Sequence, residues 1–114
     1  KLAGTKWKLE GIVNEQTGEM QILVPTDCEE CYTLEFDTDS TDTGKSTTNE
    51  QLFDFNSASI FIGTTKINEI GEDGNLYYDL LFKINSYQFF NDVLYFYCTL
   101  EGINYVLKFK KLLQ

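Results

Sequence analysis

The sequence predicts an all-β domain with one short helix, folded as a small antiparallel β-barrel that ends in a three-stranded meander. Nine Phe, seven Tyr and one Trp among 114 residues, with a single Pro, favour strands over helices. Turn residues recur at short intervals and divide the chain into seven or eight short strands, which is typical of a barrel. A two-sheet sandwich is the alternative architecture.

The meander is predicted by three apolar runs near the C-terminus, at residues 86–90, 93–100 and 105–112. Asn91-Asp92 separates the first two runs, and the Gly-containing link 101–104 separates the second pair. Links of this length and composition turn one strand back antiparallel to the next. Along the middle run, two sets of apolar or aromatic residues alternate: Leu94, Phe96, Cys98 and Leu100 on one face, and Val93, Tyr95, Tyr97 and Thr99 on the other. One set belongs to the core, and the other lies under a helix or a loop.

The first predicted strand is Lys6–Asn14, with an inward face made of Trp7, Leu9, Gly11 and Val13. A short apolar run at residues 20–24 follows it and ends at Pro25. The next clear strand covers residues 32–37, and alternation predicts an inward face of Tyr32, Leu34 and Phe36. The outward positions of this strand are then Thr33, Glu35 and Asp37.

The middle of the chain predicts weaker strands and the single helix. Strands are expected near residues 44–49, 51–56 and 59–67. The segment 75–84 instead has the spacing of one helical face, made of Leu76, Tyr77, Leu80, Leu81 and Ile84. Asp73 precedes this segment, in position to cap the helix N-terminus.

Length and charge limit the classes of protein. The 114 residues suit one domain, residues 1–114, and an apolar content of 42% supports a normal core. Nine Lys, no Arg and a net charge of −9 make nucleic acid a poor partner, because phosphate binding requires basic clusters. No apolar stretch approaches the ~20 residues that cross a bilayer. The first five residues resemble the start of a mature domain from which an upstream segment has been removed. The sequence is therefore compatible with a removed export signal or lipid-anchor segment.

Several short motifs resemble those of META-domain proteins, and the first is also loosely similar to the opening of lipocalins. The resembling positions extend through nearly the whole chain: Gly4-Thr5-Lys6-Trp7-Lys8-Leu9, residues 32–37, Gly44 with Asn49 and Phe53, Gly63-Thr64-Thr65, residues 76–84, Asn91-Asp92-Val93-Leu94 and residues 107–112. The chain departs from the family in its cysteine positions and in lacking an Asn-x-x-x-Gly segment after Asn49. The resemblance implies a small extracytoplasmic β-barrel, secreted or in the cell envelope and often a lipoprotein, without agreed catalytic residues.

Cys28 and Cys31 form the sharpest local pattern, Cys28-Glu29-Glu30-Cys31. We interpret the pair as a structural disulfide of an exported domain, with two ordinary thiols as the alternative. A zinc site needs four ligands, whereas the chain has three Cys and no His. A thioredoxin-like redox pair is disfavoured, because the pair leads into a strand and the neighbouring acids disfavour a thiolate. Cys98 lies in an apolar strand and is predicted to be a buried free thiol.

No metal, cofactor or catalytic residue is predicted. Residues 37–44 alternate oxygen-bearing side chains as a calcium loop does, but the late Gly and the missing closing Glu favour a solvated loop. Without His, the Ser–His and Cys–His nucleophile systems are excluded. A hydrolase that uses two of the 18 acidic residues as paired carboxylates is the alternative function.

The aromatic residues are the remaining candidates for function, since they can line a barrel cavity or simply fill the core. The candidate cavity residues are Trp7, Tyr32, Phe36, Tyr87, Phe89, Tyr95 and Tyr97. The expected function is therefore non-enzymatic binding of a small apolar ligand or a partner protein. Closure of a barrel also predicts that the first and last strands lie side by side. The outward lysines of these two strands would then repel one another, so an acidic neighbour such as Glu35 is expected beside them. These lysines are Lys6, Lys8, Lys108 and Lys110.

Overall fold

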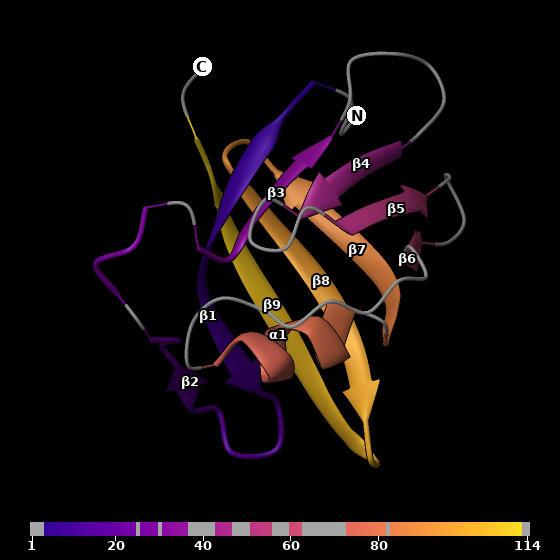
Figure 1. Cartoon of the computed structure of the whole chain (residues 1–114). Coiled ribbons are helices and arrows are strands. Elements are labelled where there is room, and N and C mark those ends of the chain that lie inside the picture. Colours follow the sequence, from indigo (N-terminus) through magenta and orange to yellow (C-terminus); the bar gives the residue numbers. More distant parts are fainter. Residues whose placement is uncertain are drawn as a thin grey trace.

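The computed structural model describes residues 4–24, 26–29, 31–36, 43–46, 51–55, 60–62, 73–81 and 83–112. Within them the chain is mostly antiparallel β-structure with one short helix, which confirms the predicted class (Figure 1). The elements are β1 (Lys6–Asn14), β2 (Met20–Gln21), β3 (Thr33–Phe36), β4 (Thr43–Ser46), β5 (Gln51–Phe55), β6 (Ile60–Ile62), α1 (Gly74–Leu81), β7 (Ile84–Phe90), β8 (Val93–Leu100) and β9 (Ile103–Lys111).

One sheet runs in the order β6-β5-β4-β3-β1-β9-β8-β7, and β2 pairs with β1 off this path. Figure 1 shows the sheet curving, with α1 across its inner face. β1 and β9 are antiparallel neighbours, which confirms the predicted contact between the first and last strands. Cα atoms of β6 and β7 come within 8 Å, but the described strand path contains no pairing between these two ends. Closure into a barrel therefore stays a prediction.

A β-bulge in β1 overturns half of its predicted inward face. Leu9 lies opposite Phe109 but Gly11 lies opposite Lys108, so Glu10 is an extra residue on this strand. An extra residue reverses the alternation of every side chain after it. Ile12, only 3% exposed, therefore takes the core position that the alternation had given to Val13. Gly11 was the available signal, because glycine inside a strand often marks a bulge.

β3 confirms the predicted inward set and corrects one outward position. Tyr32, Leu34 and Phe36 are buried, but Thr33 is also fully buried, at 0% exposure. Thr33 lies opposite Lys8 on the β1–β3 pair, and the Lys8 ammonium donates to the Cys28 carbonyl over 2.7 Å. The turn that contains Cys28 therefore lies on the outer side of this pair and keeps Thr33 from solvent. The predicted outward residue Asp37 lies outside the described residues.

The core forms between the inner face of the sheet and α1. Tyr77 of the helix is 0% exposed, and its ring centroid lies 5.3 Å from that of Tyr32 and 6.4 Å from that of Phe109. Phe96 of β8 continues the chain of rings, 5.6 Å from Phe109 in a T-shaped contact. Trp7 and the helix leucines complete a single apolar cluster. Aromatic and aliphatic side chains of this size bury enough surface to account for most of the driving force for folding.

The predicted helix is confirmed, but it ends at Leu81 and not at residue 84. The Lys83 N–H donates to the Leu80 carbonyl over 2.9 Å, and this tight turn leads directly into β7. At the other end, Asp73 directly precedes α1, at the position where the sequence predicted a helix cap. Its carboxylate accepts the Val24 N–H over 2.9 Å, so this side chain joins the start of the helix to the segment after β2.

The three-stranded meander is confirmed, since β7, β8 and β9 are consecutive antiparallel neighbours. β9 begins at Ile103 and not at residue 105, because the turn consists of Glu101 and Gly102, with positive φ of 53° and 80°. The buried set of β8 is Leu94, Phe96 and Cys98. The other set, Val93, Tyr95 and Tyr97, is half-buried on the outer face.

The outer face of β1 and β9 is a mixed-charge surface, as predicted. Lys6 lies opposite Glu35, and the Lys108 ammonium lies 3.6 Å from the Glu10 carboxylate. Lys8 lies opposite Lys110, but its ammonium is held by carbonyl oxygens of the Cys28 turn. Exposed pairs of this kind contribute ~0–1 kcal/mol each, so they prevent repulsion more than they stabilise the fold.

Candidate functional site

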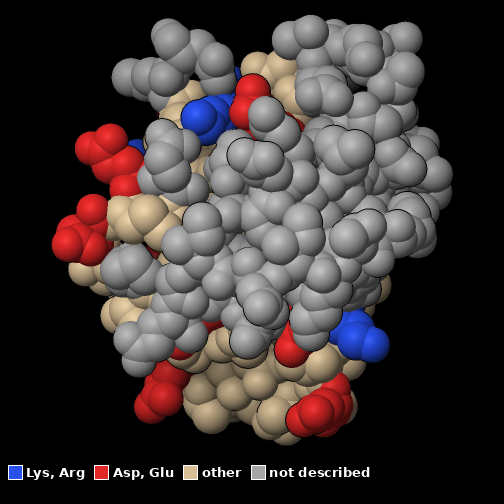
Figure 2. All heavy atoms as spheres, in the orientation of Figure 1, with Lys and Arg blue, Asp and Glu red and all other residues tan. Residues whose placement is uncertain are grey.

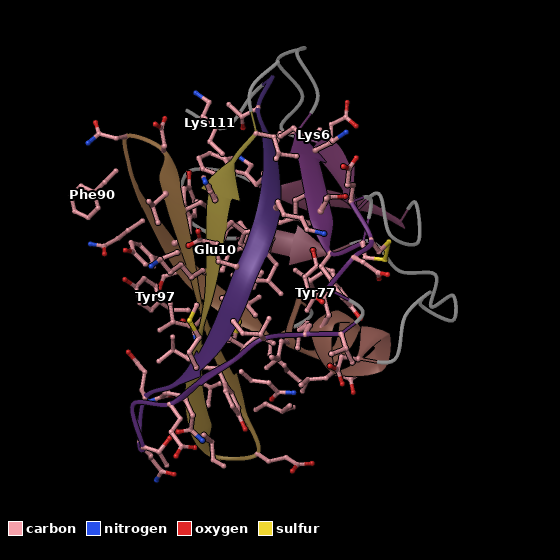
Figure 3. All side chains as sticks on the ribbon, turned by 90° about the vertical axis from the view of Figure 1, so that its left-hand side faces the viewer. Lys6, Glu10, Tyr77, Phe90, Tyr97 and Lys111 are labelled. Carbon is pink, nitrogen blue, oxygen red and sulfur yellow. A yellow bond between two sulfur atoms is a disulfide. The ribbon has the colours of Figure 1, made fainter. Side chains whose placement is uncertain are left out.

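The structure divides six of the seven candidate cavity residues between two faces of the sheet. Trp7, Tyr32 and Phe36 belong to the buried core, and Tyr87 packs half-buried against it. Tyr95 and Tyr97 lie on the outer face, and the side chain of Phe89 is outside the described part of the structure. In Figure 3, Tyr97 and Tyr77 lie on opposite sides of β1. These residues therefore cannot all line one cavity, and the inward ones pack against each other.

Tyr77 is a core aromatic residue that the list of candidates omitted. It fills the space that Tyr32 and Phe109 leave under the helix, with ring contacts to both. Its place on the apolar face of α1 was the available signal. Among the described residues, the inward aromatic side chains therefore pack against one another beneath the helix.

Three surface hollows lie along β1. The first, of about 240 Å³, is lined by Ile12, Asn14, Thr17, Glu19, Met20, Gln21 and Tyr105. The second, of about 100 Å³, is lined by Lys8, Leu9, Glu10, Ile22, Leu23, Thr26 and Tyr32. The third, of about 360 Å³, is lined by Lys6, Lys8, Glu29 and Leu112. Among the described residues that line them, each of these three hollows has one carboxylate and not the facing pair that glycoside cleavage requires.

The segment that begins with β2 presents a row of exposed apolar side chains between the first two hollows. Met20 is 40% exposed, Ile22 is 54% exposed and Val24 is 36% exposed. We name these three residues the apolar edge. Leu23 points the other way and is buried at 5% exposure, which anchors the segment in the core. Only β2 of the predicted 20–24 run is strand, and within the described residues no strand pairs with its other side.

Hydrogen bonds over a long sequence distance hold the end of the apolar edge in place. The Val24 N–H donates to the Asp73 carboxylate, and the Val24 carbonyl accepts the Tyr32 hydroxyl over 2.5 Å. The Asp73 N–H donates to the Tyr32 oxygen over 3.2 Å, which closes the network. Tyr32 itself has a positive φ of 59°, which is uncommon for a bulky residue and marks a constrained turn. The apolar edge is therefore presented on a fixed support.

The surroundings of the apolar edge are acidic. No Lys or Arg occurs between Lys8 and Lys45 in the sequence, whereas the exposed acids near the edge include Glu15, Glu19, Asp27 and Glu29. Figure 2 shows acidic atoms along the left margin of the molecule, where Figure 1 places this segment. A surface with this composition attracts positively charged partners.

Cys28 and Cys31 lie at disulfide distance in the structure, with sulfur atoms 2.09 Å and Cα atoms 5.4 Å apart (Figure 3). The bond closes the turn that follows the apolar edge. The Lys8 ammonium donates to the carbonyls of both cysteines. Sequence reasoning missed Lys8, because nothing local links residue 8 to residues 28 and 31.

The third cysteine, Cys98, is the free buried thiol that the sequence predicts, at 1% exposure. Burial raises the pKa of the Cys98 thiol from its ordinary 9.0 to about 12. The folded state thus keeps its proton at pH values where the unfolded chain loses it, so stability falls as pH rises above 9.0.

We expect wild type to lose up to about 1.4 kcal/mol more per pH unit than Cys98→Ala between pH 9 and pH 12. Urea titrations at pH 8, 9.5 and 10.5 measure this difference, and the alanine variant controls for titration elsewhere. Iodoacetamide should label Cys98 only after unfolding. Equal pH dependence of the two proteins, or rapid labelling of the folded protein, contradicts the prediction.

Comparison of the sequence with protein-family models and with curated proteins identifies no relative. No protein-family model matches the chain, and a search of curated proteins found no match.

The described part of the structure contains no cluster of three or more side chains suited to hold a metal ion. Nor does it contain a helix with the length and apolar character needed to cross a membrane. Residues 37–44, which were compared with a calcium loop and predicted to be a solvated loop, lie mostly outside the described residues.

Proposed function

We propose that the protein is a non-enzymatic binding module that takes up an extended segment of a partner protein along its apolar edge. The observation that carries this proposal is the exposure of Met20, Ile22 and Val24 in one row. Single exposed apolar residues are ordinary, but alternate exposed residues along one short segment form a continuous contact surface. The adjacent hollows of about 240 and 100 Å³ provide room for side chains of the segment.

The chemistry of the surface defines the partner segment. An added strand beside β2 would gain main-chain hydrogen bonds from a strand edge and specificity from alternate side chains. Those side chains would be apolar toward Met20 and Ile22. Lys or Arg at the remaining positions would face Glu19 and Asp27, both of which are exposed. Binding should therefore weaken as salt concentration rises.

A partner protein is preferred to a small apolar ligand because Trp7, Tyr32 and Phe36 pack within the core. We further propose that the scaffold is a META-like barrel, in agreement with the curvature of the sheet and the approach of β6 to β7. An extracytoplasmic location, in the cell envelope or secreted, agrees with the pairing of Cys28 and Cys31. The lipid anchor implied by the family resemblance belongs to this same proposal.

Selection of random peptides displayed on phage against the whole chain tests this function. Enriched peptides should alternate apolar residues with Lys or Arg. Ile22→Asp should weaken their binding at least about tenfold, which corresponds to about 1.4 kcal/mol. Phe90→Asp is the matched control, because Phe90 is 63% exposed at the end of β7, which β8 and β9 separate from β1 and β2. Failure to enrich peptides, or equal binding to wild type and Ile22→Asp, overturns the proposal.

A further inference from the structure

We propose that the Cys28–Cys31 disulfide is a thiol-exchange site, at which a small thiol opens the bond by attacking the sulfur of Cys28. This inference goes beyond the binding function and does not depend on it. The two cysteines are unequally accessible, since Cys28 is half-buried and Cys31 is only 3% exposed. Attack at a disulfide requires access to one sulfur, so the structure directs an incoming thiolate to Cys28.

The Lys8 ammonium places a positive charge beside the Cys28-Glu29-Glu30-Cys31 turn, whose own charged residues are acidic. It donates to the Cys28 carbonyl over 2.7 Å and also to the Cys31 carbonyl, so its positive charge is fixed at the turn. A nearby cation stabilises a thiolate, and a stabilised thiolate is a better leaving group. Among the described residues, the charged groups around the turn are Lys6 and Lys8 on β1, Asp27 and Glu29 in the turn, and Glu35 on β3.

The hollow of about 360 Å³ lies beside this turn and provides room for the incoming molecule. Glu29, between the two cysteines, forms one side of the hollow, and Lys6, Lys8 and Leu112 form the rest. The Lys6 and Lys8 ammonium groups, among the described lining residues, can pair with a carboxylate of the incoming molecule. A small thiol that carries a carboxylate, such as glutathione, suits this composition.

The disulfide is reduced in two successive thiol–disulfide exchange steps. A thiolate attacks the Cys28 sulfur, the new mixed disulfide forms, and the Cys28–Cys31 bond breaks with its electron pair on Cys31, which then takes up a proton. A second thiolate attacks the outer sulfur of the mixed disulfide and releases Cys28 as a thiol after protonation. Two small thiols are oxidised to one disulfide while the protein disulfide is reduced to two thiols.

Opening the bond would loosen the support of the apolar edge. Cys31 directly precedes Tyr32, whose φ of 59° is held by the surrounding turn. The Tyr32 hydroxyl donates to the Val24 carbonyl, so a relaxed Tyr32 releases the end of the edge. Thiol exchange at Cys28 therefore changes the segment after β2 without unfolding the sheet.

Reaction of the folded full chain with reduced glutathione, quenched by iodoacetamide and followed by peptide mass mapping, tests the proposal. Glutathione should appear on Cys28 before Cys31, and faster than global unfolding measured by amide exchange. Lys8→Met should slow opening about tenfold, whereas Lys8→Arg should remain within about threefold of wild type. Lys110→Met, opposite Lys8 on β9, is the matched control and should react as wild type does.

Three outcomes overturn the proposal: reduction only at the rate of global unfolding, first modification at Cys31, or equal rates for Lys8→Met and wild type. If Lys8→Met does not fold, the order of modification in wild type decides alone. Loss of peptide selection with retained Cys28 reactivity would overturn the proposed binding function and leave the exchange site standing.

Discussion

Replacing Trp7 with alanine should lower the free energy of unfolding by about 3–5 kcal/mol, the usual cost of removing a buried Trp side chain. Trp7 is 1% exposed and belongs to the central strand, between Leu34 on β3 and Lys111 on β9. Its indole N–H donates to the Thr5 hydroxyl over 2.8 Å, so the ring is both packed and oriented. The substitution removes contacts to both neighbouring strands at once and leaves a cavity that the sheet cannot collapse to fill.

Urea denaturation monitored by circular dichroism measures this loss, since the substitution removes the only Trp and with it the tryptophan fluorescence. Phe90→Ala is the control for removing a large aromatic side chain, and at 63% exposure it should change stability by less than about 0.5 kcal/mol. The loss of free energy of unfolding for Trp7→Phe should fall between the losses for Trp7→Ala and Phe90→Ala. A midpoint for Trp7→Ala close to that of wild type would show that the ring does not organise the core.

Periodicity and turn residues were sufficient to predict most of the described strands, because alternation and short links are local features of the sequence. β8 alternates cleanly through Cys98, and the short Asn91-Asp92 link set the β7–β8 register. Alternation could not identify which face of β8 is buried, since Tyr95 and Tyr97 are as apolar as Phe96 and Cys98. That choice depends on α1 lying on the inner face, which is a tertiary contact.

The candidate site was largely hidden from sequence reasoning, because long-range contacts build it. Val24 and Asp73 are 49 residues apart in sequence, and the Lys8–Cys31 contact joins residues 23 apart. Neither pair has a local pattern. Thr33 was misplaced for the same reason, as alternation cannot anticipate a turn that folds over the outer face.

Gly11→Ala should destabilise the protein by about 1–3 kcal/mol, as overpacking typically does, and should move β2. A Cβ at position 11 would lie 2.6 Å from Met20 Cε, 2.8 Å from Met20 Cγ and 3.0 Å from the Gln21 carbonyl oxygen. The Met20 side chain is 40% exposed and can swing away. The carbonyl belongs to β2, which pairs Gln21 with Ile12, so relieving that contact requires the strand itself to shift.

A double-mutant cycle with Met20→Ala separates these two contacts. If the methionine side chain causes most of the strain, Gly11→Ala should cost less in the Met20→Ala background, with a coupling energy of about 0.5–3 kcal/mol. If the Gln21 carbonyl dominates, the two costs should add, and β2 amides should exchange faster in both Gly11→Ala proteins. Because Met20 belongs to the apolar edge, Gly11→Ala should also weaken peptide binding while the outer face near Phe90 stays unchanged. A Gly11→Ala protein as stable as wild type, with unaltered β2 exchange, would contradict the close approach of β2 to the bulge in β1.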